Sequence, residues 1–454
     1  MKQGLRVVAV ALMMTMVVVA GCQPMALLEA TPTPTLTSPS TVLPTLTSSP
    51  PPTLVVAHTP SPTTIRRPTL TLRPTRTPRP LPALILGTKS GPLRLITAVD
   101  EVVAGDVQAL QSTADGTLWL ITDRAVARLV DSTWTPYLTE FAGKVAGIDT
   151  TGQVWVVSED TSQIAAWDGA SWTIYGDEAG WTALPDDGFR YVRGGQSDAV
   201  GQRWFAASHE VRVFKPDHWT THTLSDMKMD PSEFEDRFTD FKITIARSGT
   251  VWIGECDWGG PGPLGGRGAR WFAGQTWHGA QSPAASGCVM DITEDQAGHI
   301  WLGIDASLWR YDPTTEVWTD FPTDEPLLTE AHHRYIASVK VGPDGDPWPV
   351  VMLCGGASCY GNDVLYHVHD GAWTQVGAVG EFLGNEVYGP LFDPRGSIWI
   401  QWEDALYRIV RDALEVVSPL AGRYGAFDAT GRLWIVAWYE GRATLWMLTD
   451  EIKD

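Results

Sequence analysis

One short pattern recurs eight times from residue 116 onward and constrains the fold more than any other feature of the chain. In each copy a glycine stands three residues before a tryptophan whose neighbours are mostly apolar. Successive tryptophans are 35 to 51 residues apart, with a mean spacing of 45. This spacing is typical of the four-stranded blades of a β-propeller. The copies are Gly116/Trp119, Gly152/Trp155, Gly201/Trp204, Gly249/Trp252, Gly298/Trp301, Gly345/Trp348, Gly396/Trp399 and Gly431/Trp434.

The residues around each copy predict four strands in succession. An apolar strand, such as residues 145–148, runs into a turn of Asp, Thr or Ser with Gly, and glycine adopts the positive φ of such turns at little cost. The next strand carries the tryptophan between apolar residues, so both of its faces suit packing between neighbouring blades. A third strand follows at 125–130, and the fourth carries a second tryptophan such as Trp134. No helical periodicity of useful length interrupts this pattern, so we expect an all-β propeller.

The two ends of the repeat region predict how the ring closes. Before the first copy, residues 84–87 and 93–97 look like the second and third strands of a degenerate unit. After the last copy, residues 433–436 and 444–448 supply only two strands before the sequence ends. We therefore expect the N- and C-terminal strands to share a blade, because such closure removes exposed sheet edges. Eight blades are favoured, and seven are the alternative.

The fifth copy carries a resemblance to a known family. Residues 298–311 resemble the two-component regulator propeller repeat through Ile300, Trp301, Leu302, Gly303, Leu308, Arg310 and Tyr311. Residues 250–254 and 84–88 are similar, and the resemblance covers roughly residues 83–448. It implies an extracytoplasmic propeller of the kind that forms the ligand-binding sensor of hybrid histidine kinases. The Trp-rich repeat also resembles that of streptogramin lyases, which are metal-dependent propeller enzymes, so catalysis stays open as the alternative.

Residues 1–21 have the features of a bacterial lipoprotein signal peptide in the expected order. Two basic residues precede an apolar stretch at 7–20, which is too short to span a bilayer as a mature helix. The stretch ends in Val-Ala-Gly-Cys at Cys22, which resembles the lipobox. The resemblance implies that Cys22 carries lipid and becomes the mature N-terminus, anchored on the outer side of the cytoplasmic membrane. An ordinary secretory signal with an incidental cysteine is the alternative.

Residues 22–82 are expected to form a disordered, lipid-anchored linker that precedes a propeller domain at 83–454. Between residues 23 and 82 there are 15 Pro, 15 Thr and a single acidic residue. Such a segment has too little apolar surface to offset the entropy of ordering it, and proline favours extended conformations. The linker would therefore hold the propeller away from the membrane.

Four cysteines map to the same face of the expected ring. We call the face that carries the glycine turns the bottom face, so first strands begin, and second strands end, on the opposite, top face. In an exported protein the expected pairing is two disulfides, Cys256 with Cys288 and Cys354 with Cys359. A zinc site made by these four residues is the alternative, although they lack paired CxxC spacing.

Charged residues that enter the first strands from the top face are expected to surround the central channel. A ring that mixes cations with carboxylates suits an anionic or sugar-like ligand. His333 and Glu386 would take the general-base and metal-binding roles if the chain were a lyase. The ring residues are Asp106, Lys144, Arg190, Arg237, His332, His333, Arg334, Glu386 and Arg423.

Two tryptophans, Trp258 and Trp181, lie outside the repeat positions and are expected to be exposed on loops, where they would contact a ligand or partner.

The formal net charge of -20 disfavours nucleic-acid binding, because the chain would repel phosphate backbones. We therefore expect a monomeric, non-catalytic binding protein without a cofactor, whose partner is a protein or glycan. A metal-dependent lyase or hydrolase and an envelope scaffold are the alternatives.

Overall fold

The computed structural model describes residues 89–449 with short gaps, and these residues fall within the compact unit Thr77–Asp454. The expected signal peptide, Cys22 and the linker lie outside the described residues. The gaps are 114, 131–132, 138–142, 150–151, 169, 185–191, 208, 217, 230–237, 260–261, 280, 323–332, 355–362, 377–387, 403–404, 411–412 and 421.

The described residues form eight antiparallel sheets, as the repeat predicts. Two 3-10 turns, η1 (Val99–Glu101) and η2 (Asp177–Ala179), are the helical elements among them. From inner to outer strand, the first seven sheets are β3 (Val107–Ser112), β4 (Leu118–Thr122), β5 (Val126–Val130), β6 (Thr133–Tyr137); β7 (Gly143–Ile148), β8 (Val154–Ser158), β9 (Ile164–Trp167), β10 (Trp172–Tyr175); β11 (Val192–Ser197), β12 (Arg203–Ala207), β13 (Glu210–Phe214), β14 (Trp219–Thr223); β15 (Phe238–Ile245), β16 (Val251–Gly259), β17 (Gly262–Ala273), β18 (Thr276–His278); β19 (Val289–Glu294), β20 (Ile300–Ile304), β21 (Ser307–Asp312), β22 (Val317–Phe321); β23 (His333–Val341), β24 (Pro347–Cys354), β25 (Asp363–His369), β26 (Ala372–Gln375); and β27 (Tyr388–Phe392), β28 (Ile398–Trp402), β29 (Ala405–Val410), β30 (Ala413–Ser418).

The eighth sheet joins the two ends of the propeller and confirms the expected closure. It runs from β31 (Gly422–Phe427) through β32 (Leu433–Tyr439) and β33 (Arg442–Leu448) to β2 (Leu93–Ala98) and β1 (Lys89–Ser90). The N-terminal β2 is therefore the fourth strand of this blade, paired with β33. The expectation that residues 93–97 form a third strand is wrong, because they are the fourth strand of this shared blade. The other expected strand, residues 84–87, lies outside the described residues.

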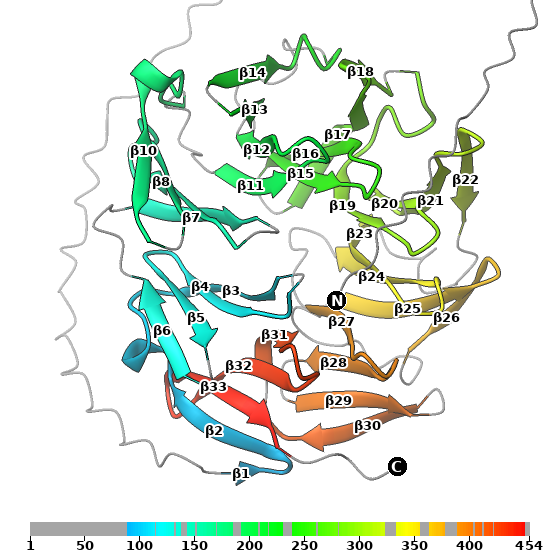
Figure 1. The fold of residues 1–454 in the computed structure, drawn as a ribbon. Helices are drawn as coiled ribbons and strands as arrows, with labels where there is room; N and C mark the ends of the chain where they lie inside the picture. The colour runs from blue at the N-terminus through cyan, green and yellow to red at the C-terminus, as the bar shows by residue number, and fades with distance from the viewer. Residues whose placement is uncertain are drawn as a thin grey trace, which may run out of the picture. The chain divides into compact units, whose positions relative to one another are not determined.

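The blades close into a ring of eight (Figure 1). From β7 to β31, each inner strand contacts the inner strand of the next blade, and β7 contacts the first blade through β4. The contact of β31 with β3 closes the ring. The preferred count of eight blades is thereby confirmed over seven.

The repeated glycines have the conformation that the turn requires. All eight have φ between 76° and 91°, the left-handed region that side chains disfavour. The structure adds a role for the aspartate six residues before several of the tryptophans. Its Oδ2 accepts a hydrogen bond from the indole Nε1, at 2.9 Å for Asp198 and Trp204, 3.0 Å for Asp295 and Trp301, 3.2 Å for Asp393 and Trp399, and 2.9 Å for Asp428 and Trp434.

The repeated tryptophans form the core between blades, as the sequence predicts. Each is at most 4% exposed. Trp204 of the third blade packs against Phe272 and Trp277 of the fourth, with ring centroids 5.0 and 6.3 Å apart. Contacts of this kind tie neighbouring sheets together, so these side chains serve the fold and are not free to stack on a ligand.

Candidate ligand-binding site

A cavity of about 950 Å³ lies against the inner strands of the first three blades. Its walls come from β3, β7 and β11 and from the top-face ends of β4 and β8. The apolar part of the wall is made by Ala109, Ile121, Val145, Ala146, Val157 and Val192. We call it the β3–β7–β11 cavity, and its volume suits a ligand the size of a small oligosaccharide.

Two glycines bring β7 and β11 together beside this cavity. A Cβ atom added to Gly147 would lie 1.8 Å from the carbonyl oxygen of Gly194, so any side chain there would force the strands apart. Gly194 itself has φ of 124°, which also favours glycine. Since Gly147 lines the cavity near the bottom-face end of β7, this close approach fixes the shape of the site.

The polar groups of the cavity mix charges of both signs with amides and hydroxyls. Lys144 on β7 is exposed, and Arg193 on β11 adds a second cation. Asp123 and Glu159 immediately follow the second strands β4 and β8. Asp123 Oδ1 accepts a hydrogen bond of 2.7 Å from the backbone N–H of Asp106. The remaining polar lining is Gln108, Gln111, Ser158 and Thr161. Such a set can donate hydrogen bonds to, and accept them from, a polyhydroxylated ligand.

The expected ring of charged residues is only partly described. Lys144 lines the cavity, whereas Arg334 lies on β23 and the exposed Arg423 on β31, where its guanidinium carbon is 5.8 Å from the ring centroid of Tyr424. His333 begins β23. Arg190, Arg237, His332 and Glu386 lie outside the described residues, so the proposed lyase pair of His333 and Glu386 is not placed.

Trp181 is fully buried, so the expectation that it is exposed on a loop is wrong. Its indole Nε1 donates a hydrogen bond of 3.0 Å to the carbonyl of Thr161. The guanidinium carbon of Arg212 lies 4.3 Å from the ring centroid, and Trp219 packs edge-on at 4.8 Å. Trp181 therefore joins the second and third blades and does not present its ring to a ligand.

The fourth blade carries a long hairpin where the sequence suggested a glycine-rich loop. The strands β16 and β17 have nine and twelve residues, against four to eight in the second and third strands of the other blades. Trp258 lies within β16, opposite Phe238 and Pro263 in the strand register, so its expected place on a loop is also wrong. The hairpin forms because backbone pairing continues through the glycines.

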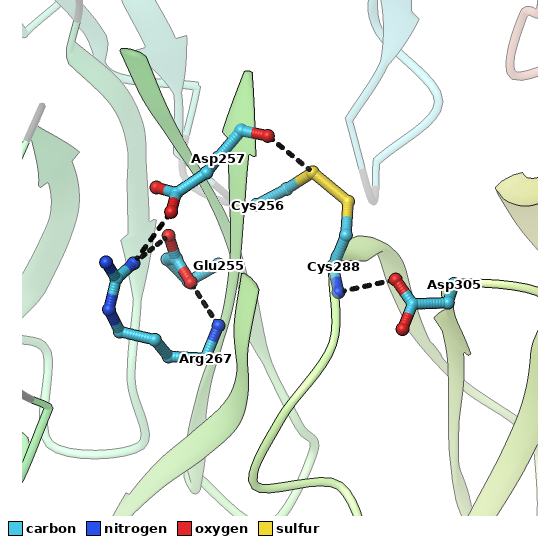
Figure 2. The surroundings of a disulfide bond; sticks show 6 residues. All are labelled: Glu255, Cys256, Asp257, Arg267, Cys288 and Asp305. Carbon is cyan, nitrogen blue, oxygen red and sulfur yellow. Dashed lines mark hydrogen bonds and ion pairs between the residues drawn. A yellow bond between two sulfur atoms is a disulfide. The ribbon is translucent and has the colours of Figure 1, made fainter. Parts of the chain in front are cut away.

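A disulfide joins this hairpin to the fifth blade, as the sequence analysis expects (Figure 2). Cys256 of β16 is bonded to Cys288, which immediately precedes β19, and both are fully buried. The backbone N–H of Cys288 donates a hydrogen bond of 2.9 Å to Asp305 Oδ1. Cys354 ends β24, and Cys359 lies outside the described residues, so the second expected disulfide stays a prediction.

A buried charge cluster lies beside the disulfide (Figure 2). Arg267 Nη1 contacts Glu255 Oε1 at 2.9 Å and Asp257 Oδ2 at 3.2 Å, and its backbone N–H donates to Glu255 Oε2. Burial, followed by the neighbouring Asp257 carboxyl group, raises the pKa of Glu255 to about 8. Because Glu255 has no exposed surface, we assign the cluster to the internal support of the hairpin.

The described residues thus form a β-propeller with a polar-lined cavity against its inner strands. No protein-family model and no curated protein sequence matches the chain. Among the described residues, no helix is long and apolar enough to cross a membrane.

Solved structures similar to the chain include the following three. Virginiamycin B lyase from Staphylococcus aureus is 15% identical, with a TM-score of 0.43 over 68% of this chain and 95% of that one. The extracellular domain of BT3049 from B. thetaiotaomicron, described as a hybrid two component system, is 14% identical, with a TM-score of 0.38 over 77% and 58%. YCF48 bound to D1 peptide is 12% identical, with a TM-score of 0.42 over 83% and 99%.

Proposed function

We propose that this chain is an extracytoplasmic, non-catalytic binding protein that holds an oligosaccharide-sized polar ligand in the β3–β7–β11 cavity. A lipid on Cys22 anchors it at the cell surface, and the proline-rich residues 22–82 serve as the spacer. The observation that carries the proposal is the composition of the cavity wall, which combines cations, carboxylates, amides and hydroxyls with aliphatic residues.

The placement of the polar groups supports a hydroxyl-rich ligand over a flat protein surface. Lys144 and Arg193 come from neighbouring inner strands, whereas Asp123 and Glu159 come from the top-face ends of second strands. A ligand in the cavity therefore meets cations and carboxylates from different blades. Charge-assisted hydrogen bonds of this kind orient sugars, and the apolar wall between them accommodates ring faces.

A thermal-shift screen of the purified full chain tests the proposal. The probes are neutral and uronic-acid-containing oligosaccharides, each with and without EDTA. A ligand that binds only the folded state at a hundredfold excess over Kd stabilises it by about 2.7 kcal/mol. We expect a shift from an oligosaccharide that EDTA does not change. Turnover of a probe only in the presence of metal would instead support a lyase, and no shift from any probe would contradict the cavity proposal.

The anchor has its own test. We expect mass spectrometry of the exported chain to find a lipidated Cys22 at its N-terminus, and Cys22→Ala to release the chain from the membrane fraction. An unmodified N-terminus elsewhere would contradict the lipoprotein assignment without affecting the cavity.

A further inference from the structure

The sixth blade departs from the repeat at its bottom-face turn. Five turns carry an aspartate six residues before the repeated tryptophan, but the sixth has Gly342 at that position. The indole Nε1 of Trp348 is buried and has no hydrogen-bond partner among the described residues. The carboxylates of this turn stand instead at Asp344 and Asp346, on either side of Gly345.

The third strand of the same blade departs from the repeat as well. In the first, fifth and seventh blades an arginine lies over the repeated tryptophan, with guanidinium carbon to ring distances of 5.6 to 5.9 Å. In the sixth blade His367 of β25 stacks on Trp348 instead, with ring centroids 4.2 Å apart and an interplanar angle of 16°. His369 stands two residues further along β25, on the same face of the strand.

These departures bring imidazoles and carboxylates together. Asp344, Asp346 and His367 each offer a ligand atom, and these atoms all lie within 4.8 Å of one another. His367 Nε2 is 3.2 Å from Asp346 Oδ2, and His369 Nδ1 is 2.6 Å from the same oxygen. The side chains of Asp346 and His367 are 21% and 25% exposed, so the cluster is shielded but reachable from solvent.

We infer that the bottom face of the sixth blade binds a divalent transition-metal ion, of which Zn²⁺ is the type, through Asp344, Asp346 and His367. Imidazole nitrogen and carboxylate oxygen are both ordinary Zn²⁺ ligands, and a three-residue set leaves a position for water. His369 acts as the positioning residue, because its hydrogen bond orients the Asp346 carboxylate. The bound ion ties the β23–β24 turn to β25, on a different face from the proposed ligand cavity.

Metal titration of the full chain, free of any affinity tag, tests this site. We expect calorimetry to find one Zn²⁺ per chain at this site, and Co²⁺ to give visible ligand-field absorption when it replaces Zn²⁺. His367→Phe keeps the ring over Trp348 and removes the ligand nitrogen, whereas Asp346→Asn keeps the side-chain shape and removes the charge. Each of these two substitutions is expected to weaken metal binding at least tenfold. His369→Ala is expected to weaken it by about tenfold, which is the low end of the losses seen when the hydrogen-bond partner of a metal ligand is removed.

His222 supplies the matched control. Its ring is stacked on that of Trp204 in the third blade, with ring centroids 5.7 Å apart and an interplanar angle of 4°. The ring of His367 is stacked on Trp348 in the same way. We expect His222→Phe to leave the metal affinity unchanged. The inference is overturned if the full chain binds no Zn²⁺ or Co²⁺, or if His367→Phe binds the ion as tightly as the parent chain.

Discussion

Replacing Cys256 and Cys288 with alanine removes the covalent link between the hairpin of the fourth blade and the first strand of the fifth. The two cysteines are 32 residues apart in sequence. In the chain-entropy model, a closed loop of this length destabilises the unfolded state by about 4 kcal/mol at 25 °C. Met290, Tyr335 and Met352 pack around the buried bond. We therefore expect the double variant to lose about 4 kcal/mol of unfolding free energy.

Urea unfolding measures this loss, and a second pair of substitutions isolates it. In a Cys354→Ala/Cys359→Ala background, Cys256–Cys288 is the one disulfide that a reductant can open within the propeller. Adding reductant to that background should lower the unfolding free energy by about the same amount as removing Cys256 and Cys288. Reductant should have no effect once all four cysteines are replaced. A loss below about 1 kcal/mol on reduction, or free thiols at both positions in the untreated chain, would show that this bond does not stabilise the propeller.

Three further predictions concern single side chains. The pKa of Glu255 is about 8 in the folded state, above its ordinary value of 4.5. The unfolded state therefore releases this proton first, so the free energy of unfolding falls as pH rises between those two values. Glu255→Gln should make the urea midpoint decline less steeply with pH than in the parent chain, and equal slopes would contradict this. Asp428→Ala leaves the buried indole N–H of Trp434 without an acceptor and should lower the free energy of unfolding in urea by about 1 to 3 kcal/mol. Asp428→Asn keeps an acceptor oxygen and should lower it less, so equal losses in the two variants would contradict this role. Trp181→Ala removes a fully buried ring and should lower the free energy of unfolding by about 3 to 5 kcal/mol without changing ligand affinity. Weaker ligand binding at unchanged stability would show instead that this side chain contacts the ligand.

The fold could be predicted because its determinants are local and repeated. Each blade needs one positive-φ residue after its first strand, and glycine supplies it at the same place eight times. The closure between β2 and β33 could be predicted because the C-terminal repeat lacks outer strands and extra strands precede the N-terminal repeat. The exact role of residues 93–97 could not, because it depends on which edge of the last sheet is open.

The residues of the cavity were harder to predict because they come from three different blades, which only the closed ring brings together. Lys144 could be predicted from its place at the top-face start of a first strand. Arg193 could not, since only the register of β11 brings it to the cavity. Trp181 was misplaced because its burial depends on Arg212 and Trp219, which come from the third blade. The sequence predicts a loop at Trp258 where the structure has a hairpin, because glycine content does not determine whether backbone pairing continues.

Binding of a ligand in the β3–β7–β11 cavity can be tested at Lys144, which lines it. The measurement is the affinity of Lys144→Ala for the oligosaccharide that stabilises the parent chain most. Lys215→Ala is the matched control, because Lys215 follows β13 at the bottom face. We expect at least tenfold weaker binding by Lys144→Ala and unchanged binding by Lys215→Ala. Equal affinity of the parent chain and Lys144→Ala would contradict it.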